Sequence, residues 1–199
     1  MDSTQEAGTE ARILRAAEEV FLRDGYDGAR MQVIAETAGI NKALLHYYSR
    51  SKEKLFEQIM LRLLSQFLPQ VTAAFTADMS AHQRMEAFVG AYLNLLRSNP
   101  QLPLFILHSL NRHPEFVAYV PRNLYEVIAG FLKQEMGAGN IRRVDPDQFL
   151  LSILGMCIFP FVARPMAMHM MHKTEDEYNA LLNKRKAEIM LLISTITRV

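Results

Sequence analysis

The side chains best suited to chemistry lie in one short stretch near the start of the chain. They are hydrogen-bond donors, one cation and groove-sized apolar groups: Asn41, Lys42, Leu44, His46 and Tyr47. Donors and cations bind phosphates, whereas donors and apolar groups together contact the base edges exposed in a DNA groove. The chemistry that this set predicts is recognition of a nucleic acid.

Two short helices joined by a tight turn must position these side chains. The apolar residues are spaced so that the two helices face each other, and they are Ile34, Ala35, Ala38, Ile40 and Leu45. Ala35 is small enough to let the helices cross closely. Gly39 lies where the turn requires a residue that tolerates positive φ. The stretch from Met31 to Tyr48 is therefore interpreted as a helix-turn-helix, which fits the major groove of DNA.

The net charge of the whole chain is only +1, so it gives no nucleic-acid signal. Between Arg30 and Lys54, however, five cations and two carboxylates give a local charge of +3. A modest patch suits a module that docks as a dimer and so doubles its phosphate contacts. An ordinary solvated face is the alternative interpretation of the same charges.

Catalytic and metal-binding motifs are poorly represented. The sequence has no glycine-rich phosphate loop, His-Glu metal motif or nucleophile elbow, so we expect no enzyme and no cofactor. His169 and His172 lie among methionines, and imidazoles with thioethers could bind copper or zinc. We favour a methionine-rich helix end with two histidines near its C-terminal carbonyls, and we expect no metal site.

The chain shows features of a cytoplasmic protein without membrane contact. Cys157 is the only cysteine, so no intrachain disulfide can form, which fits a reducing compartment. The N-terminus lacks the basic start and apolar core of a signal peptide. The longest uncharged run, Phe149 to Ala163, is shorter than the ~20 apolar residues of a membrane span.

That apolar run must nevertheless be covered on all sides. The last helix adds an apolar stripe from Tyr178 to Ile196. A two-fold pairing of these two segments with a second copy would form a four-helix bundle. We therefore expect a homodimer that is formed through the last two helices.

Helical patterns continue to the C-terminus, and no stretch combines the alternation and hairpin turns typical of strands. The first helix is predicted from about Thr9 to Asp24, with Gly25 as its stop, and Pro69 is predicted to end or kink the fourth. Capping signals mark the starts of later helices at Ser51, Ser80 with Gln83, Asp145 with Pro146, and Thr174 with Glu177. The predicted fold class is all-α.

The stretch Ala11 to Ile59 resembles the tetracycline-repressor (TetR) family of bacterial transcription regulators. The matching pieces are a helix ending in Phe21, Gly25-Tyr26, Ile34-Ala35, Ala38-Gly39, Asn41-Lys42 and Ser51-Lys52-Glu53. The resemblance implies an N-terminal three-helix DNA-binding domain in residues 1–50. It also implies a helical ligand-binding and dimerisation domain in residues 51–199.

The resemblance also implies which residues contact a double-stranded DNA operator. Phosphate contacts are expected near the start of the second helix, base contacts on the third, and another phosphate contact at the start of the fourth. The set is Arg30, Gln32, Asn41, Lys42, Ala43, Leu44, His46, Tyr47 and Lys52. The last of these lies at a helix N-terminus, where backbone N–H groups help to hold a phosphate.

The sequence departs from the family pattern in three places. Ala29 and Arg30 stand where Thr or Ser usually caps the second helix, and Asp27 is the substitute cap that we expect. Leu44 replaces a small polar residue, which suggests contact with a thymine methyl group. Ser49 replaces a Phe that usually packs beneath the recognition helix, which weakens the predicted packing of the domain.

The body of such regulators commonly encloses a small molecule. Aromatic and sulfur-bearing residues at helical spacing are candidates to line a cavity, with core packing as the alternative for each of them: Tyr92, Phe105, His108, Tyr119, Tyr125, Met156, Cys157 and Phe161. Walls of this composition predict a lipophilic effector.

The sequence therefore predicts a dimeric regulator that leaves a palindromic operator when such an effector binds. Repression is the usual mode of action in the family. Two alternatives stay open: a dimeric DNA-binding protein without a ligand, and an all-α carrier or enzyme that retains a helix-turn-helix as scaffold.

Overall fold

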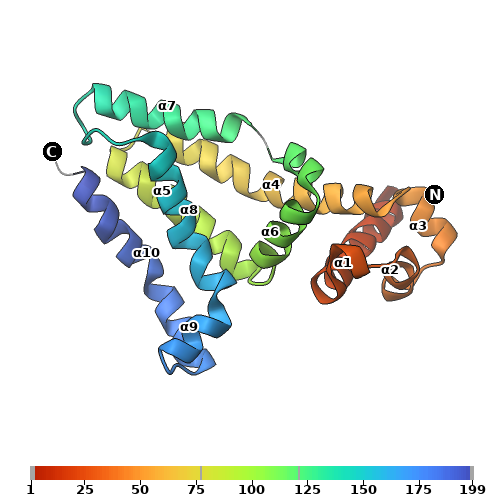
Figure 1. Cartoon of the computed structure of the whole chain (residues 1–199). Coiled ribbons are helices and arrows are strands. Elements are labelled where there is room, and N and C mark those ends of the chain that lie inside the picture. The colour runs from red at the N-terminus through yellow and green to blue at the C-terminus, as the bar shows by residue number, and fades with distance from the viewer. Residues whose placement is uncertain (1–2, 77, 121, 198–199) are drawn as a thin grey trace. The chain divides into compact units, whose positions relative to one another are not determined.

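The computed structural model describes residues 3–76, 78–120 and 122–197, which are mostly helical and contain no strand (Figure 1). This confirms the all-α prediction. The chain forms two compact units, which are described separately: Met1–Ser65 with Leu104–Val120, and Gln66–Pro103 with Pro121–Val199. Helices α4 (Lys52–Thr76) and α6 (Leu102–Arg112) each have residues in both units.

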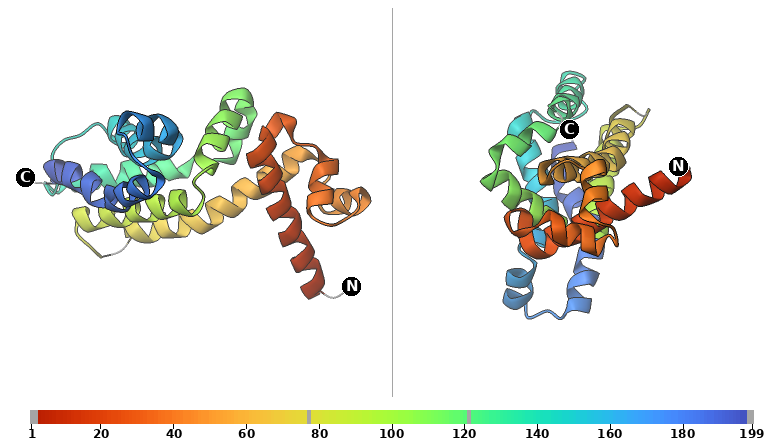
Figure 2. Two further views of the ribbon diagram at one scale, coloured as in Figure 1. Left: turned by 90° about the horizontal axis from the view of Figure 1, so that it is seen from below. Right: turned by 90° about the vertical axis from the view of Figure 1, so that its right-hand side faces the viewer.

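The first unit contains the predicted helix-turn-helix. Its complete elements are α1 (Ser3–Gly28), α2 (Met31–Thr37), α3 (Lys42–Tyr48) and the 3-10 helix η1 (Pro114–Tyr119). The unit also contains the start of α4 and most of α6. Helix α2 packs between α1 and α3 (Figure 2). Helix α1 begins earlier than predicted, and Gly25, with φ 72° and ψ 169°, breaks its helical path at the predicted stop.

An aromatic cluster forms the core of the first unit. We use this name for five buried rings: Phe21, Tyr26, Phe56, Phe105 and Phe116. The ring centroids of Phe56 and Phe116 are 4.5 Å apart, and those of Tyr26 and Phe116 are 4.9 Å apart. These separations lie in the range of favourable aromatic pairs. The segment Leu104–Val120 therefore supplies two of the five rings on which α1 and α4 pack.

The second unit is a helical bundle. Its helices are α5 (Ala81–Ser98), α7 (Asn123–Gly137), α8 (Pro146–Val162), α9 (Arg164–Met170) and α10 (Glu175–Thr197), with the second half of α4. Helix α5 packs along α10 and against α8, while α7 packs on α8 (Figures 1 and 2). The core contains Val89, Leu93, Leu132, Ile153 and Ile189, which are almost completely buried.

The predicted capping residues are confirmed. Ser80 and Gln83 form a reciprocal capping box, and the Asp145 carboxylate accepts from the backbone N–H groups of residues 147 and 148. Glu177 and Thr174 exchange bonds at the start of α10. Pro69 does not end α4, because the helix continues past it to Thr76.

Helix α8 contains a proline in its last turn and a half, and α10 compensates for it. Pro160 has no N–H, so it cannot pair with the carbonyl oxygen of Met156 four residues earlier. Arg185 of α10 donates to that oxygen through Nε and Nη2, at 3.1 and 3.0 Å. The buried Tyr178 hydroxyl donates to the carbonyl oxygen of Pro160 at 2.8 Å. Two side chains of α10 thus satisfy backbone groups that the proline and the helix end leave unpaired.

No single helix of the described residues has both the length and the apolar composition of a membrane span. Helices α8 and α9 meet these criteria only as a pair, and they are bent by 78° with respect to each other.

We predict that Arg185→Met lowers the free energy of unfolding by about 1–3 kcal/mol, because the Met156 carbonyl loses its donors in a half-buried position. In a Pro160→Ala background the cost should fall, since residue 160 then supplies a backbone N–H. Urea unfolding at fixed protein concentration measures both differences, with the exposed neighbour Lys184→Met as control. Equal costs in the two backgrounds would show that Arg185 does not act through this carbonyl.

Candidate DNA-binding surface

The turn between α2 and α3 has the geometry that the sequence predicts. Gly39 has a φ of 66°, a conformation that favours glycine. The Ile40 N–H donates to the Ala35 carbonyl at 3.0 Å, and the Gly39 N–H donates to Glu36 at 3.0 Å. This is a Schellman ending, which satisfies the last carbonyls of α2 and turns the chain into α3.

Helix α3 presents one polar face to solvent. Lys42, Ala43, His46 and Tyr47 are all exposed and share that face, and the Tyr47 side chain is 75% exposed. Leu45 on the opposite side is completely buried. Leu44 is half-buried at the edge of the exposed face, so it has less free surface than predicted for a residue that meets a thymine methyl.

The remaining candidates on α2 and α3 are exposed but partly occupied. Arg30 is the N-cap residue of α2, and no side chain caps that helix. Asp27 therefore does not replace the missing cap, and this expectation was wrong, because its carboxylate is bound elsewhere. Gln32 donates to Glu36 one turn later. Asn41 caps α3, since its Oδ1 accepts from the Leu44 N–H at 2.8 Å.

Ser49 connects the end of α3 to α4. Its side chain is buried, and its Oγ donates to Oε1 of Gln58 at 2.7 Å. A hydrogen bond thus joins the end of α3 to α4 at this position. The loss of packing that we expected at Ser49 is accompanied by a specific polar contact, which satisfies a buried hydroxyl.

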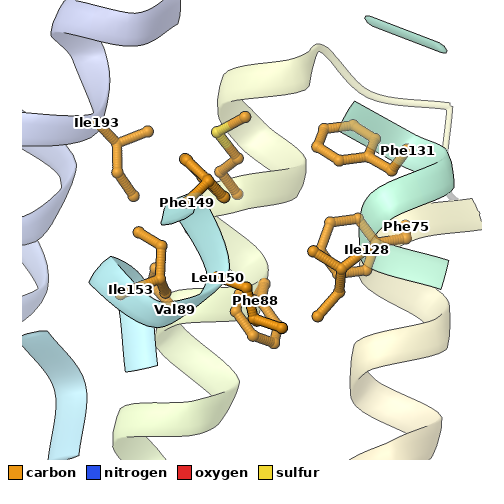
Figure 3. A pocket seen from close by; sticks show the side chains of 10 residues that line it. Phe75, Phe88, Val89, Ile128, Phe131, Phe149, Leu150, Ile153 and Ile193 are labelled. Carbon is orange, nitrogen blue, oxygen red and sulfur yellow. The ribbon is translucent and has the colours of Figure 1, made fainter. Parts of the chain in front are cut away.

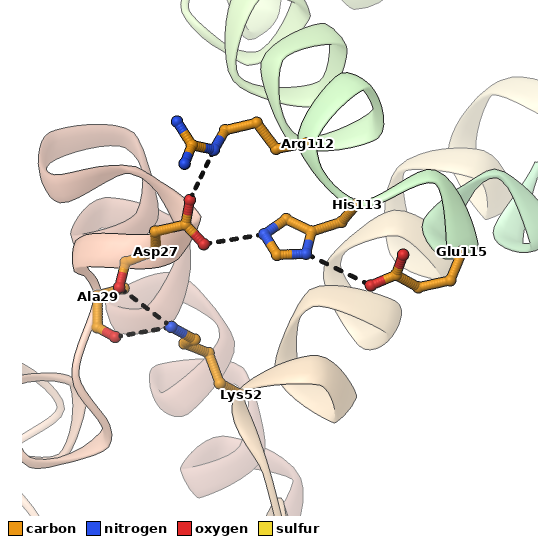
Figure 4. Close-up of polar contacts among 6 residues, drawn as sticks. All are labelled: Asp27, Ala29, Lys52, Arg112, His113 and Glu115. Carbon is orange, nitrogen blue, oxygen red and sulfur yellow. Dashed lines mark hydrogen bonds and ion pairs between the residues drawn. The ribbon is translucent and has the colours of Figure 1, made fainter.

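Lys52 lies at the start of α4, but its ammonium group points into the first unit (Figure 4). Nζ donates to the carbonyl oxygens of Asp27 and Ala29, both at 3.3 Å, and lies 4.6 Å from the centre of the Tyr26 ring. Lys52 therefore holds the linker between α1 and α2. The phosphate contact predicted for it stays a prediction, and the ammonium has one donor left for it.

Neighbouring groups and burial shift the pKa values of three residues near this linker. Burial is the main reason that the pKa of the Tyr26 hydroxyl is raised, so this ring stays neutral at pH 7. The hydrogen bond with His113 is the largest influence that lowers the pKa of the Asp27 carboxyl, and Arg112 and Lys52 add to it. A hydrogen bond from Ser51 is the main reason that the pKa of Glu53 is lowered.

The eight predicted ligand-contacting residues are divided between the two units. Phe105, His108 and Tyr119 belong to the first unit; Phe105 is in the aromatic cluster and His108 is exposed. Tyr92, Tyr125, Met156, Cys157 and Phe161 belong to the second unit.

Four of the five residues in the second unit take part in a hydrogen bond or have a pKa that burial raises. Tyr125 donates to Asp147, and the Met156 carbonyl accepts from Arg185. Burial raises the pKa of the Cys157 thiol to about 12 and also raises the pKa of Tyr92. A ligand contact at any of the eight residues stays a prediction.

A small apolar cavity in the second unit is lined by other residues (Figure 3). They come from α4, α5, α7, α8 and α10 and are Phe75, Met85, Phe88, Val89, Ile128, Phe131, Phe149, Leu150, Ile153 and Ile193. The empty space is about 10 Å³, close to the minimum for one water molecule. Sequence patterns mark these residues as core, and nothing in the patterns distinguishes core from cavity wall.

Comparison with known proteins agrees with this geometry. Residues 13–59 match the family of bacterial regulatory proteins called the tetR family. The regulator RutR of Escherichia coli K12 is 29% identical over 149 residues, which cover 71% of this chain and 68% of RutR. The repressor NicS of Pseudomonas putida is 30% identical over 131 residues, which cover 65% of this chain and 55% of NicS.

A solved structure shares the fold of the whole chain. The TetR/AcrR-family regulator from Thermobifida fusca superimposes with a TM-score of 0.64 and 19% identity, covering 91% of this chain and 96% of that one. The fold and the exposed face of α3 define a helix-turn-helix, DNA-binding transcription regulator. The similarity to the TetR family is carried by residues 13–59.

We predict that Lys52→Met lowers the free energy of unfolding by about 1–2 kcal/mol, because two carbonyl oxygens and the Tyr26 ring lose their cation. Lys54→Met is the matched control, since Lys54 is exposed and pairs only with Glu57 one turn away. Thermal and urea unfolding compare the two variants. If Lys52→Met keeps full stability and only flattens the salt dependence of DNA binding, its main role is the phosphate contact.

Proposed function

We propose that the protein represses transcription as a homodimer bound to a palindromic operator, and that a small lipophilic molecule releases it. The observation that carries this proposal is the exposed face of α3, with a cation, an imidazole and a phenol next to a buried Leu45. Repression is favoured by the similarity to NicS, which its name describes as a repressor.

Each candidate side chain has a proposed role at the DNA. Lys42 contacts phosphate, and Arg30 and Gln32 add phosphate contacts from α2. His46 and Tyr47 meet base edges in the major groove, where donors and rings distinguish base pairs. Ala43 allows close approach of the recognition helix α3, and the edge of Leu44 contacts a thymine methyl. The proposed DNA-binding domain spans residues 1–50, and the regulatory domain spans 51–199.

Dimerisation is proposed to use α8 and α10. Each helix buries one side in the second unit, while the other side leaves large apolar groups in solvent. Leu151 and Phe159 of α8 are 64% and 56% exposed, and Leu191 and Leu192 of α10 are 64% and 53% exposed. Apolar surface of this kind typically marks an interface. Pairing with the same surface of a second copy would cover it, as two-fold symmetry allows.

A selection experiment tests the DNA-binding proposal and the dimer together. We predict that the protein selects a palindrome from a pool of random duplexes and binds it as two chains, whereas Leu192→Glu gives monomers with much lower affinity. Lys42→Ala should weaken all sequences alike and reduce the salt slope, while His46→Ala should cost about 1–3 kcal/mol at particular base pairs. Titrations at several salt concentrations and sedimentation measure these effects.

The outcomes of that experiment are distinct. Selection of a palindrome by two chains, with base-specific loss in His46→Ala, supports the proposal. No enrichment of any sequence would contradict operator recognition. A native protein that sediments as a monomer at micromolar concentration would contradict the dimer.

The proposed release depends on the spacing of the two recognition helices. On B-DNA they must lie about 34 Å apart, or a multiple of this distance, to enter successive turns of the major groove. An effector that binds better to a dimer with another spacing lowers operator affinity by shifting the population. Helix α4 is the proposed link, since it begins in the first unit and ends at the cavity wall at Phe75.

The proposed effector site is the apolar cavity of the second unit. Its walls are carbon and one methionine side chain, which favours a molecule with few hydrogen-bonding groups (Figure 3). Because the empty space is only about 10 Å³, a ligand must displace side chains such as Met85, whose flexible thioether can repack. The small volume equally favours the alternative of a dimeric DNA-binding protein without a ligand, so the two must be separated by experiment.

We predict that uncharged lipophilic molecules raise the melting temperature in a thermal-shift screen and release the selected duplex, because they bind only the folded protein. Val89→Ile adds one methylene group at the cavity wall and should reduce both effects. Val117→Ile, the same change at an exposed position, is the control. Stabilisation only by highly charged metabolites would contradict the apolar site, and no stabilisation by any molecule would favour the ligand-independent alternative.

A further inference from the structure

Asp27 lies at the end of α1, beyond the break at Gly25, and binds the segment Leu104–Val120 (Figure 4). Its Oδ2 pairs with Nε of Arg112 at 3.0 Å, and its Oδ1 lies 2.8 Å from Nε2 of His113. Its own backbone carbonyl accepts from Lys52. Asp27, which precedes the helix-turn-helix, is therefore held by residues of α6 and α4 and by the N-cap residue of η1.

The two side-chain contacts of Asp27 differ in strength. Arg112 is 62% exposed, and ion pairs at such exposed positions contribute little. His113 is only 26% exposed, and its ring packs against Tyr26 at 4.8 Å and against Phe116 at 5.1 Å between centroids. His113 is thus the partner whose position is fixed, because the aromatic cluster holds its ring.

Both ring nitrogens of His113 face carboxylates. Nε2 faces Asp27, and Nδ1 lies 3.3 Å from Oε1 of Glu115. A neutral imidazole has one N–H and can donate to only one of them, whereas an imidazolium donates to both. The two-sided contact is complete only when His113 carries a positive charge.

The charged groups around His113 come from every element that packs on it. The anions are Asp27 from α1 and Glu115 from η1, and the cations are Arg112 from α6 and Lys52 from α4. The carboxylates are in direct contact with the ring, and the two cations contact Asp27 instead. The hydrogen bond with His113 is the largest influence that lowers the pKa of Asp27, which agrees with a contact between opposite charges.

We propose that Asp27 is a positioning residue for operator binding and that its hold on Leu104–Val120 strengthens when His113 is protonated. The linker leads directly into α2, and α2 packs on the recognition helix α3. When the linker is held more firmly, α2 and α3 are better ordered in the protein before it binds DNA. Because imidazole side chains in general change charge between about pH 5 and pH 8, a comparison of pH 6 with pH 8 tests the proposal.

The proposal rests on operator binding, and its test is the pH dependence of that binding. Titration of the selected duplex at pH 6 and pH 8 gives, for each protein, the affinity at pH 6 divided by the affinity at pH 8. In Asp27→Asn and in His113→Gln that ratio should fall about two- to fivefold below the native one, the range of a partly exposed charge pair. The double variant should fall no further than either single variant. All of these proteins retain His46, so any effect of this residue on the affinity ratio is common to them and cancels from the comparison.

Asp24→Asn is the matched control, because Asp24 is an exposed carboxylate near the end of α1 that pairs with its neighbour Arg23. It should keep the native ratio. An equal loss of affinity in Asp27→Asn at both pH values would overturn the proposal, since a purely structural role predicts that result. So would an unchanged ratio in His113→Gln.

Hydrogen exchange of the α2 amides without DNA gives a second readout that does not depend on operator binding. At each pH, exchange in Asp27→Asn is compared with exchange in the native protein. A loss of protection that is larger at pH 6 than at pH 8 supports the proposal, and a loss that is equal at both overturns it. Failure of the native protein to bind any duplex would count against the proposed function, and this readout would still decide the role of Asp27.

Discussion

The aromatic cluster is the interaction on which the first unit depends. Helices α2 and α3 have seven residues each, and α3 buries only Leu45. Helices this short are not stable alone and require tertiary packing. The ring centroids of Phe56 and Phe116 are 4.5 Å apart, and those of the stacked rings of Phe21 and Phe105 are 5.8 Å apart. A segment that is distant in sequence thus completes the core on which α1 and α4 pack, and α1 in turn packs on α2.

This shared core explains why polar contacts gather at the linker between α1 and α2. Gly25 breaks the helix just before it, and the start of α2 has no side-chain cap. Lys52 donates to the carbonyl oxygens of Asp27 and Ala29. The Asp27 carboxylate binds His113 and Arg112. The linker is therefore defined by contacts from outside it. Helix α6, which begins in the second unit, ends with Arg112, and His113 follows it as the N-cap residue of η1.

The helix-turn-helix was predictable from the sequence because its determinants are local. Gly39 adopts positive φ, and Leu45 lies inside, as the spacing requires. Capping residues such as Ser80 and Asp145 act within one turn, so their roles could also be predicted. The role of Asn41 as the cap of α3 carried a recognisable signal as well, since it directly precedes the helix, although we assigned it to DNA alone.

Contacts between distant segments could not be predicted. Nothing near Asp27 indicates that its partners are Arg112 and His113, and Lys52 has the same sequence signature whether it holds a phosphate or two carbonyls. The cavity posed the same difficulty, because Phe88 and Phe131 have the spacing of any core residue. The compensation of Pro160 by Arg185 also depends on tertiary packing, although the unpaired carbonyl follows from the proline itself.

Leu104–Val120 completes the aromatic cluster with α1 and α4, and we infer that it supports α2 and α3 through α1. Hydrogen–deuterium exchange of Phe116→Ala tests it most directly, with the exposed neighbour Val117→Ala as control. Local opening is expected wherever buried contacts are lost. We expect faster exchange in the amides of α2 and α3 for Phe116→Ala and native exchange for Val117→Ala. Native protection of α2 and α3 in Phe116→Ala would contradict it.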